Sequence, residues 1–115
     1  MKKDNVLSGQ REFDRVYNKG QSYAYRHVVV FYNKNFTGKN RISFVASKKV
    51  GNAVQRNRSR RLMREAVRLS NINIEGYDFI FIARKSIVDQ DMFSVKLCIE
   101  NLIRRIEKNI GKKKI

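Results

Sequence analysis

The chain has 115 residues, with 26 Lys or Arg against 10 Asp or Glu, so its formal net charge is +16. This length predicts one domain over residues 1–115, and the positive charge, which repels itself in a compact chain, indicates a polyanionic partner. One Cys and one His exclude an internal disulfide and argue against a structural zinc site, and no apolar run of about 18 residues is available to span a bilayer.

The first predicted element is a short amphipathic helix. Residues 1–8 are expected to form a loose lead-in, with Ser8 as the N-cap of the helix and Gly20 just beyond its last turn. Phe13 and Tyr17 recur at helical spacing, and Val16 lies between them, which predicts one apolar face.

Two segments rich in β-branched and aromatic residues, 28–32 and 42–47, are predicted to be strands. The polar stretch between them contains Gly38 and reads as a turn, so we expect the two strands to pair as a hairpin. Because side chains alternate along a strand, Val29 and Phe31 share one face of the first strand.

A long helix is predicted to begin at Asn52. Gln55 follows three residues later, so the two side chains can form a capping box. Its apolar stripe is expected to comprise Val54, Leu62, Met63, Ala66 and Val67.

The last elements are a strand and a helix. Residues 79–83 are apolar at every position, so both faces of this strand are expected to be covered. The final helix should begin near Asp91 or Ser94 and end at Gly111, before a basic tail at 112–115. The predicted order is αββαβα, which indicates an α+β fold built as a two-layer α/β sandwich.

The most informative segment is residues 48–68, in which eight of 21 residues are Lys or Arg and one is acidic. Four arginines in it recur at i+4 spacing and therefore lie along one face of the helix. They are Arg56, Arg60, Arg64 and Arg68. Like charges at this spacing destabilise a helix by about 0.2–0.5 kcal/mol per pair, and phosphates opposite them reverse that repulsion.

The start of this helix also favours an anion. Gly51 allows close backbone approach, the helix N-terminus carries a partial positive charge, and Lys48 and Lys49 lie beside it. We therefore predict that the segment binds RNA phosphates. A solvated cationic helix and a membrane-surface helix are the weaker alternatives, because mixed-sign pairs usually serve solubility and the apolar stripe lacks an aromatic residue.

A second group of residues is aromatic. If the first helix lies on the Phe31 face of the strand, Phe13, Tyr17 and Phe31 line a groove. Exposed aromatic side chains beside cations bind single-stranded nucleic acid, and each stacked base contributes roughly 1–3 kcal/mol. Packing in the core is the alternative role for these aromatic residues.

The sequence offers no catalytic constellation. It has no paired carboxylates, no triad and no phosphate-binding Gly-rich loop, His27 has no acidic partner, and Cys98 lies in the apolar stripe of the last helix. We expect a binding protein with no metal site of its own, no small-molecule substrate and no membrane contact. The single Cys suits a reducing compartment, so a cytoplasmic location is expected.

Residues 48–61 resemble the RNR signature of the bacterial ribonuclease P protein family. Residues 12–20, 41–49 and 78–84 resemble the first helix, second strand and third strand of that family. Its proteins assist a catalytic RNA, and together they remove the 5′ leader of precursor tRNA with Mg²⁺ held mainly by RNA. The resemblance also implies a ribosomal protein S5 domain 2-like fold with an unusual left-handed crossover between the second and third strands.

The resemblance assigns site residues. It implies that the catalytic RNA is contacted by Lys48, Lys49, Asn52, Arg56, Asn57, Arg58, Arg60, Arg61, Arg64 and Arg68. It implies that the leader of precursor tRNA lies in a cleft formed by Phe13, Tyr17, Val29, Phe31 and Ala83. The alternatives are a ribosomal or other structured-RNA-binding protein with no processing role and, less well supported, a nuclease in its own right.

Overall fold

The computed structural model describes residues 6–113, and the predicted α+β class is confirmed. The elements in chain order are α1 (Gln10–Lys19), β1 (Gln21–Tyr25), β2 (Val28–Lys34), β3 (Arg41–Val45), α2 (Ala53–Leu69), β4 (Tyr77–Ala83), the 3-10 helix η2 (Lys85–Asp89) and α3 (Met92–Lys113). The predicted order holds for the three helices and three of the strands. The edge strand β1 and η2 are additional.

The four strands form one sheet in the order β1-β2-β4-β3. β2 is antiparallel to both β1 and β4, whereas β3 is parallel to β4. The predicted hairpin between segments 28–32 and 42–47 is therefore wrong, because β4 lies between them. The physical reason is that β4 is apolar on both faces and takes a central position, while β2 forms its hairpin with β1 through Arg26 and His27.

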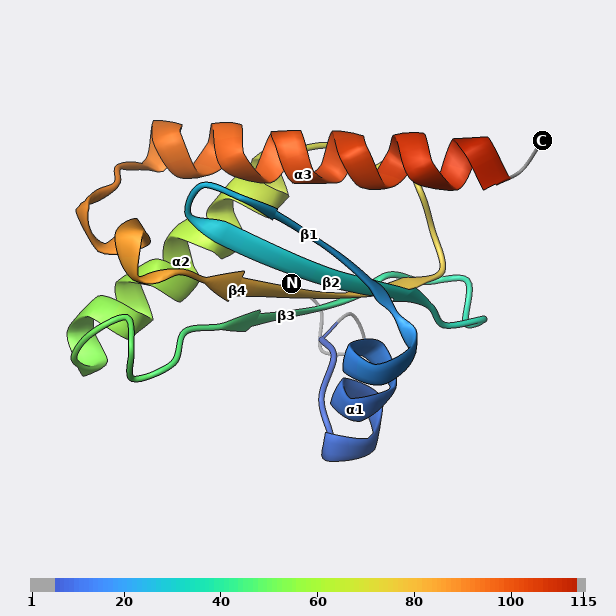
Figure 1. Ribbon diagram of the computed structural model, residues 1–115, viewed down its shortest axis with the longest axis horizontal. Helices are drawn as coiled ribbons and strands as arrows, with labels where there is room; N and C mark the ends of the chain where they lie inside the picture. The colour runs from blue at the N-terminus through green and yellow to red at the C-terminus, as the bar shows by residue number, and fades with distance from the viewer. Residues whose placement is uncertain (1–5, 114–115) are drawn as a thin grey trace.

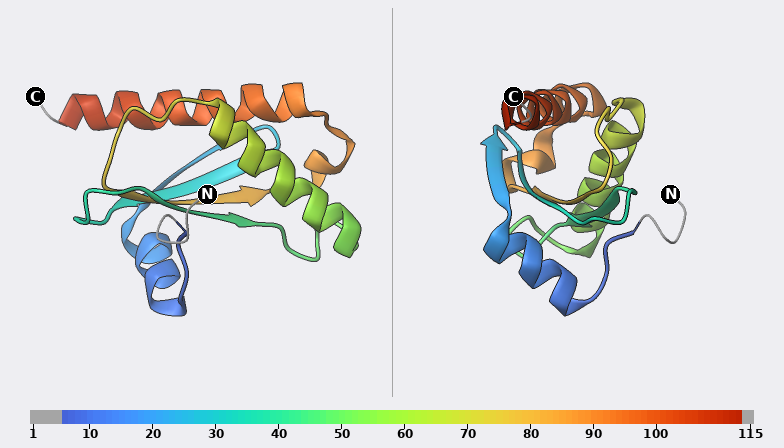
Figure 2. Two further views of the ribbon diagram at one scale, coloured as in Figure 1. Left: turned by 180° about the vertical axis from the view of Figure 1, so that it is seen from behind. Right: turned by 90° about the vertical axis from the view of Figure 1, so that its right-hand side faces the viewer.

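The helices are divided between the two faces of the sheet. α3 and α2 cover one face and α1 lies against the other (Figure 1). In the rear view of Figure 2, the yellow-green α2 lies in front of β3 and β4, both strands point to the right, and β4 lies above β3. The β3–α2–β4 connection is thus left-handed, as the resemblance implied, against the strong right-handed preference of such units.

The core has two parts, one on each face of the sheet. Phe79 and Phe81 point toward α2 and α3 and are almost fully buried. Ile80 points the other way and packs with Leu7 and Val16 beneath α1. This confirms that both faces of β4 are covered.

The expectation of a loose lead-in over residues 1–8 is wrong for its described part. Leu7 is 2% exposed, and its N–H donates to the carbonyl of Ile42 at 3.1 Å. Val6 forms a parallel bridge with the same residue. Burial of a large apolar side chain and a backbone hydrogen bond fix this segment on β3; residues 1–5 and 114–115 lie outside the described part.

The predicted ends of two helices also need correction. The N-cap of α1 is Gly9, with φ 93° and no side-chain hydrogen bond, and not Ser8. Gly20 is extended, with φ −85°. Glycine is needed there because the chain is closely packed: a Cβ would come within 2.4 Å of the carbonyl oxygens of Val16 and Tyr32. Gly111 does not end α3, because the helix continues to Lys113 and so includes part of the predicted tail.

The start of α2 follows the prediction closely. Gln55 N–H donates to Asn52 Oδ1, and Asn52 N–H donates to Gln55 Oε1, each at 2.9 Å, which completes the capping box. Val54 is 77% exposed and does not belong to the buried stripe. It precedes the buried Met63 by two and a half turns at 3.6 residues per turn, so it points the opposite way.

Candidate nucleic-acid interface

The row of arginines at i+4 spacing on α2, here called the arginine face, borders the edge strand β3. It consists of Arg56, Arg60, Arg64 and Arg68. The Arg60 guanidinium donates to the carbonyl of Ala46 at 3.4 Å, just beyond β3. The Arg64 guanidinium carbon lies 5.6 Å from the ring centroid of Phe44, within β3. The face is therefore held against the rim of the sheet.

Some arginines of the segment are used within the protein. Arg58 donates to the carbonyl oxygens of Gln90 at 2.8 Å and Val88 at 3.4 Å, which ties α2 to the end of η2. Arg60 also donates to the side chain of Asn57. Arg58 and Arg60 thus stabilise the fold in addition to adding charge.

Others lack an acidic partner. Among residues 6–113, no carboxylate lies within salt-bridge distance of Arg56, Arg61 or Arg64, nor of Lys48 or Lys49. Of these five, all but Arg56 are exposed. They carry the part of the positive charge that is available to a phosphate.

Arg68 differs from its neighbours, because it forms an ion pair with Glu65 one turn earlier on α2. The Arg68 guanidinium holds the pKa of the Glu65 carboxyl below its usual range through hydrogen bonding. Glu65 therefore stays ionised at neutral pH and competes with any phosphate for Arg68.

The N-terminus of α2 is shaped by its cap. Gly51 has φ 149°, and a Cβ on it would lie 2.0 Å from Gln55 Oε1, so only glycine fits beside the capping box. Asn52, predicted to contact RNA, uses its side-chain oxygen on the N–H of Gln55. Its main contribution in this structure is to hold the first turn of the helix.

The name aromatic groove is kept for the predicted leader site, which comprises Phe13 and Tyr17 of α1 with Val29 and Phe31 on one face of β2. The ring centroids of Phe13 and Tyr17 are 6.3 Å apart, and those of Tyr17 and Phe31 are 5.0 Å apart in an edge-on arrangement. The condition set by the sequence, that α1 lies on the Phe31 face, is therefore met. Tyr17 is 37% exposed, and the buried part raises the pKa of its phenol, which stays uncharged at neutral pH.

Ala83 does not belong to this groove. It pairs with Val28, is 5% exposed, and packs into the core beneath α2 and α3 on the opposite face. The adjacent Ile82 pairs with Val29 and lies on the groove face, together with Val45 of β3. Sequence reasoning missed these two residues, because strand alternation identifies them only after the pairing of β4 with β2 and β3 is known.

A buried ionic network holds α1 on the sheet. Asp78 of β4 is 1% exposed, and each of its carboxylate oxygens accepts a hydrogen bond from Arg41 at 2.8 Å. Arg41 also donates to Glu12 of α1 at 3.0 Å, and Asn35 donates to Asp78 at 2.8 Å. Hydrogen bonding to Asp78 raises the pKa of Arg41 above its usual value. This network connects three elements that surround the groove.

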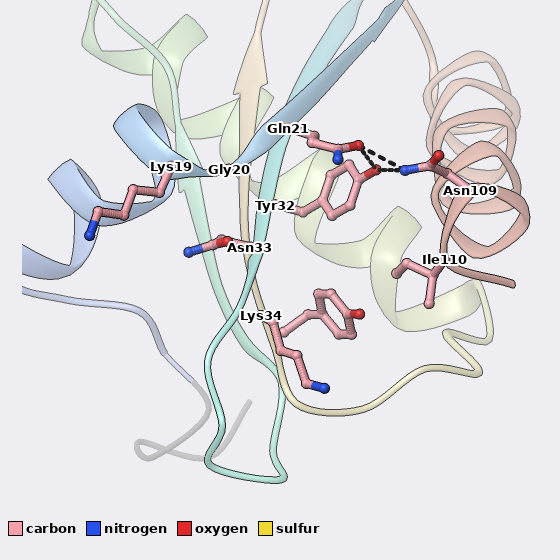
Figure 3. A pocket seen from close by; sticks show the side chains of 9 residues that line it. Lys19, Gly20, Gln21, Tyr32, Asn33, Lys34, Asn109 and Ile110 are labelled. Carbon is pink, nitrogen blue, oxygen red and sulfur yellow. Dashed lines mark hydrogen bonds between the residues drawn. The ribbon is translucent and has the colours of Figure 1, made fainter. Parts of the chain in front are cut away.

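A polar pocket of about 390 Å³ lies between the ends of α1 and α3 (Figure 3). The Tyr32 hydroxyl donates to Gln21 Oε1 at 3.0 Å and accepts from Asn109 Nδ2 at 2.8 Å. Burial is the main cause that raises the pKa of Tyr32 to about 12. These bonds attach α3 to the sheet, away from the arginine face.

The described part of the chain has neither a metal-binding cluster nor a helix that could span a membrane. No three His, Cys, Asp or Glu side chains in residues 6–113 are grouped so that they could hold a metal ion. No helix in that range combines the length and the apolar character needed to cross a membrane.

Comparison with known proteins gives a consistent result. The model of the Ribonuclease P family matches residues 1–107. The ribonuclease P protein component of Pelotomaculum thermopropionicum is 42% identical over 110 residues, which cover 95% of this chain and 98% of the relative. That of Clostridium botulinum is 40% identical over 106 residues, covering 90% of this chain and 95% of the relative.

Solved structures that resemble this chain are also ribonuclease P proteins. The ribonuclease P protein of Staphylococcus aureus is similar with a TM-score of 0.81 and 31% identity, covering 89% of this chain and 94% of that chain. The ribonuclease P protein of Thermotoga maritima is similar with a TM-score of 0.78 and 28% identity, covering 87% of this chain and 96% of that chain. The likeness extends over nearly the whole fold.

Proposed function

This chain belongs to the ribonuclease P protein family, and we propose that it binds the catalytic RNA of ribonuclease P and the 5′ leader of precursor tRNA. The arginine face and its flanking cations bind the catalytic RNA, and the aromatic groove receives the leader. Removal of the leader then gives the mature 5′ end of the tRNA.

Contact with the catalytic RNA is electrostatic. Arg56, Arg61 and Arg64 have no carboxylate partner in the described part of the chain, so a phosphate can bind them without displacing a carboxylate. Each planar guanidinium can bind a phosphate with two hydrogen bonds, and each contact releases condensed counterions. Lys48 and Lys49 add point charges next to the N-terminus of α2.

The groove suits a single strand without fixed sequence. The Tyr17 and Phe31 rings meet in a T-shaped arrangement, and 37% of the Tyr17 surface is exposed, which leaves an aromatic surface for a base. Stacking depends little on base identity, because every base has a π face. A variable leader therefore fits this groove better than a folded RNA.

The protein supplies positioning and charge, and the catalytic RNA supplies the chemistry. Mg²⁺ is required by the assembled enzyme and is held mainly by RNA. The partners in this proposal are the catalytic RNA and precursor tRNA, and the place of action is the cytoplasm.

One observation carries the proposal: the two surfaces meet at one edge strand. Within β3, Phe44 lies under Arg64 of the arginine face, and the adjacent Val45 lies on the groove face. A protein with this arrangement can hold a structured RNA and a free strand at the same time.

The test is cleavage of precursor tRNA by the cognate catalytic RNA at low Mg²⁺, with and without the protein. We expect the protein to raise the cleavage rate and the affinity for precursor tRNA. No change in either would refute the proposal. Crosslinks from leader nucleotides to Phe13, Tyr17 and Phe31 separate this role from that of a structured-RNA-binding protein, which would show none. Cleavage by an RNA-free preparation would instead identify a protein nuclease.

A further inference from the structure

A cavity of about 300 Å³ lies where the turn between β1 and β2 meets the first half of α3. We call it the turn pocket. Its lining includes Arg26, His27, Leu97, Glu100, Asn101 and Arg104. It lies on the side of the sheet that carries α3, opposite to the groove face, and no residue of it was assigned to a site by the sequence.

The wall of the turn pocket is rigidly held. Arg26 has φ 49°, a left-handed conformation that is uncommon for a residue with a side chain. Arg84 fixes this turn, because its guanidinium donates to the carbonyl of Arg26 at 3.3 Å and its N–H to that of His27 at 2.9 Å. On the other side, the Cys98 thiol donates to the carbonyl of Tyr25 at 2.7 Å.

The charge of the pocket is positive and largely uncompensated. Arg26 and Arg104 are both exposed, and within residues 6–113 neither has a carboxylate at salt-bridge distance. The one acidic side chain in the lining, Glu100, pairs with Lys96 at 3.5 Å. Two guanidinium groups from opposite walls are therefore available to an anion.

The pocket also offers an apolar surface and a hydrogen-bonding group. Leu97 lines the pocket and is 49% exposed, and Phe93, which lies one helical turn before Leu97 on α3, is 67% exposed. Asn101 Oδ1 is buried without a hydrogen-bond partner. An amide turns readily about χ2, so this group can face the cavity when a ligand enters. A phosphate, a flat apolar ring and a polar edge are the parts of a nucleotide.

Cations connect the turn pocket to the start of α2. A second hollow, of about 630 Å³, has the cations Lys49 and Lys85 in its lining, together with Ser86 and one carboxylate, Asp89. Ser86 Oγ is hydrogen-bonded to His27 Nδ1 of the turn pocket at 2.8 Å. The start of α2, η2 and the turn between β1 and β2 all lie at one end of the molecule, on the left in Figure 1. Arg58 bridges the same elements through its bond to Gln90, which lines the turn pocket.

We propose that a nucleotide of the catalytic RNA binds in the turn pocket, with its phosphate between Arg26 and Arg104 and its base against Leu97 and Phe93. The RNA contact surface then continues from α2 across η2 to α3. The occupant is the catalytic RNA and not the leader, because the aromatic groove lies on the other face of the sheet. This inference rests on the proposed function.

The first experiment measures affinity for the catalytic RNA alone, over a range of salt concentrations, for the double variant Arg26→Ala with Arg104→Ala. We expect the dependence of log K on log salt to flatten by about two units and the affinity to fall about tenfold or more near physiological salt. The control is Arg11→Ala with Lys108→Ala, which removes the same charge from two exposed residues without ion pairs among the described residues. If the two double variants lose the same affinity for the catalytic RNA, net charge alone explains the loss, and the proposed nucleotide site in the turn pocket is wrong.

The second experiment locates the contact. Leu97→Cys and Val54→Cys, each labelled with a benzophenone maleimide, are crosslinked to the catalytic RNA; the native Cys98 is fully buried. We expect both probes to crosslink, each to one RNA segment. Crosslinking from Val54→Cys alone would overturn the turn pocket and leave the proposed function standing. Crosslinking from neither position, together with unchanged affinity of Arg61→Ala, would refute the proposed function itself.

Discussion

The arginine face and the aromatic groove are assembled in different ways. The arginine face belongs to one helix, and its capping box and its spacing are both local properties of residues 52–68. The groove exists only because α1 and β2 meet, with rings of the two elements 5.0 Å apart. One surface is therefore specified by a short stretch of chain, and the other by the tertiary fold.

This difference has a consequence for stability. The groove depends on the ionic network that joins α1 to the sheet through Glu12, Arg41 and Asp78. The arginine face depends on contacts of α2 with β3 and η2, made by Arg58 and Arg60. Damage to the network should therefore impair the two surfaces unequally.

The largest expected effect is that of Asp78→Ala. The substitution leaves Arg41 without its main acceptor and removes one of the two acceptors of the Asn35 amide in a buried site. Breaking a buried ion pair by removing one partner destabilises a protein by about 3–5 kcal/mol. Urea unfolding, followed by circular dichroism, should show this loss.

Asp14→Ala is the matched control, since Asp14 lies on α1 but is exposed and, among residues 6–113, hydrogen-bonded only to Gln10. It should change the free energy of unfolding by less than about 0.5 kcal/mol. Similar losses for both variants would show that the charge of Asp78, and not its buried network, is what matters.

The next effect in size is that of Tyr17→Ala on substrate binding. Loss of one stacked base should weaken binding of precursor tRNA by roughly 1–3 kcal/mol, and binding of mature tRNA much less. Dissociation constants of the assembled enzyme for the two RNAs measure this difference. Phe36→Ala is the control, because Phe36 is 85% exposed but lies in the loop after β2, outside the groove. Equal losses for both RNAs would contradict the assignment of the leader to the groove.

The sequence predicts the arginine face, which lies on one helix, better than the aromatic groove, which two elements form together. The periodicity of α2 and its capping box need no knowledge of the fold, and only Val54 was assigned to the wrong face. Residue patterns predict three groove residues, Phe13, Tyr17 and Phe31, on condition that α1 covers the Phe31 face, and the family resemblance adds Val29 and Ala83. Ala83 was misplaced, because its orientation depends on how β4 pairs with β2.

The strand order of the sheet is harder to predict from the sequence than its helices, for a physical reason. β1 is an edge strand with mostly exposed side chains, and its turn at Arg26 and His27 has neither Gly nor Asn, the usual signal of a tight hairpin. Without that signal, the residue pattern favours the nearest apolar segment, 42–47, as the partner of β2. The left-handed crossover that carries β4 between them follows from the family resemblance and not from any residue pattern.

Within α2, a smaller effect separates arginines that bind RNA from arginines that stabilise the fold. Arg61→Ala and Arg64→Ala should each weaken binding to the catalytic RNA and flatten its salt dependence by about one unit. Arg58→Ala should instead lower the thermal stability of the protein, because the carbonyls of Gln90 and Val88 lose their donor. Salt titrations and thermal melts of the three variants distinguish the two roles. A melting temperature for Arg58→Ala equal to that of the unaltered protein would contradict this division.

The smallest expected effect is a steeper salt dependence of binding to the catalytic RNA. Glu65 is the only acidic residue of α2, and it occupies Arg68 at the end of the arginine face. Glu65→Gln removes this competitor, so the salt dependence of binding to the catalytic RNA should steepen by up to about one unit. Glu75→Gln makes the same change of net charge at an exposed residue outside α2 and serves as the control. If Glu65→Gln steepens the salt dependence and Glu75→Gln does not, Arg68 reaches the RNA, and all four arginines of the arginine face contact it. If neither variant steepens it, the contact ends at Arg64.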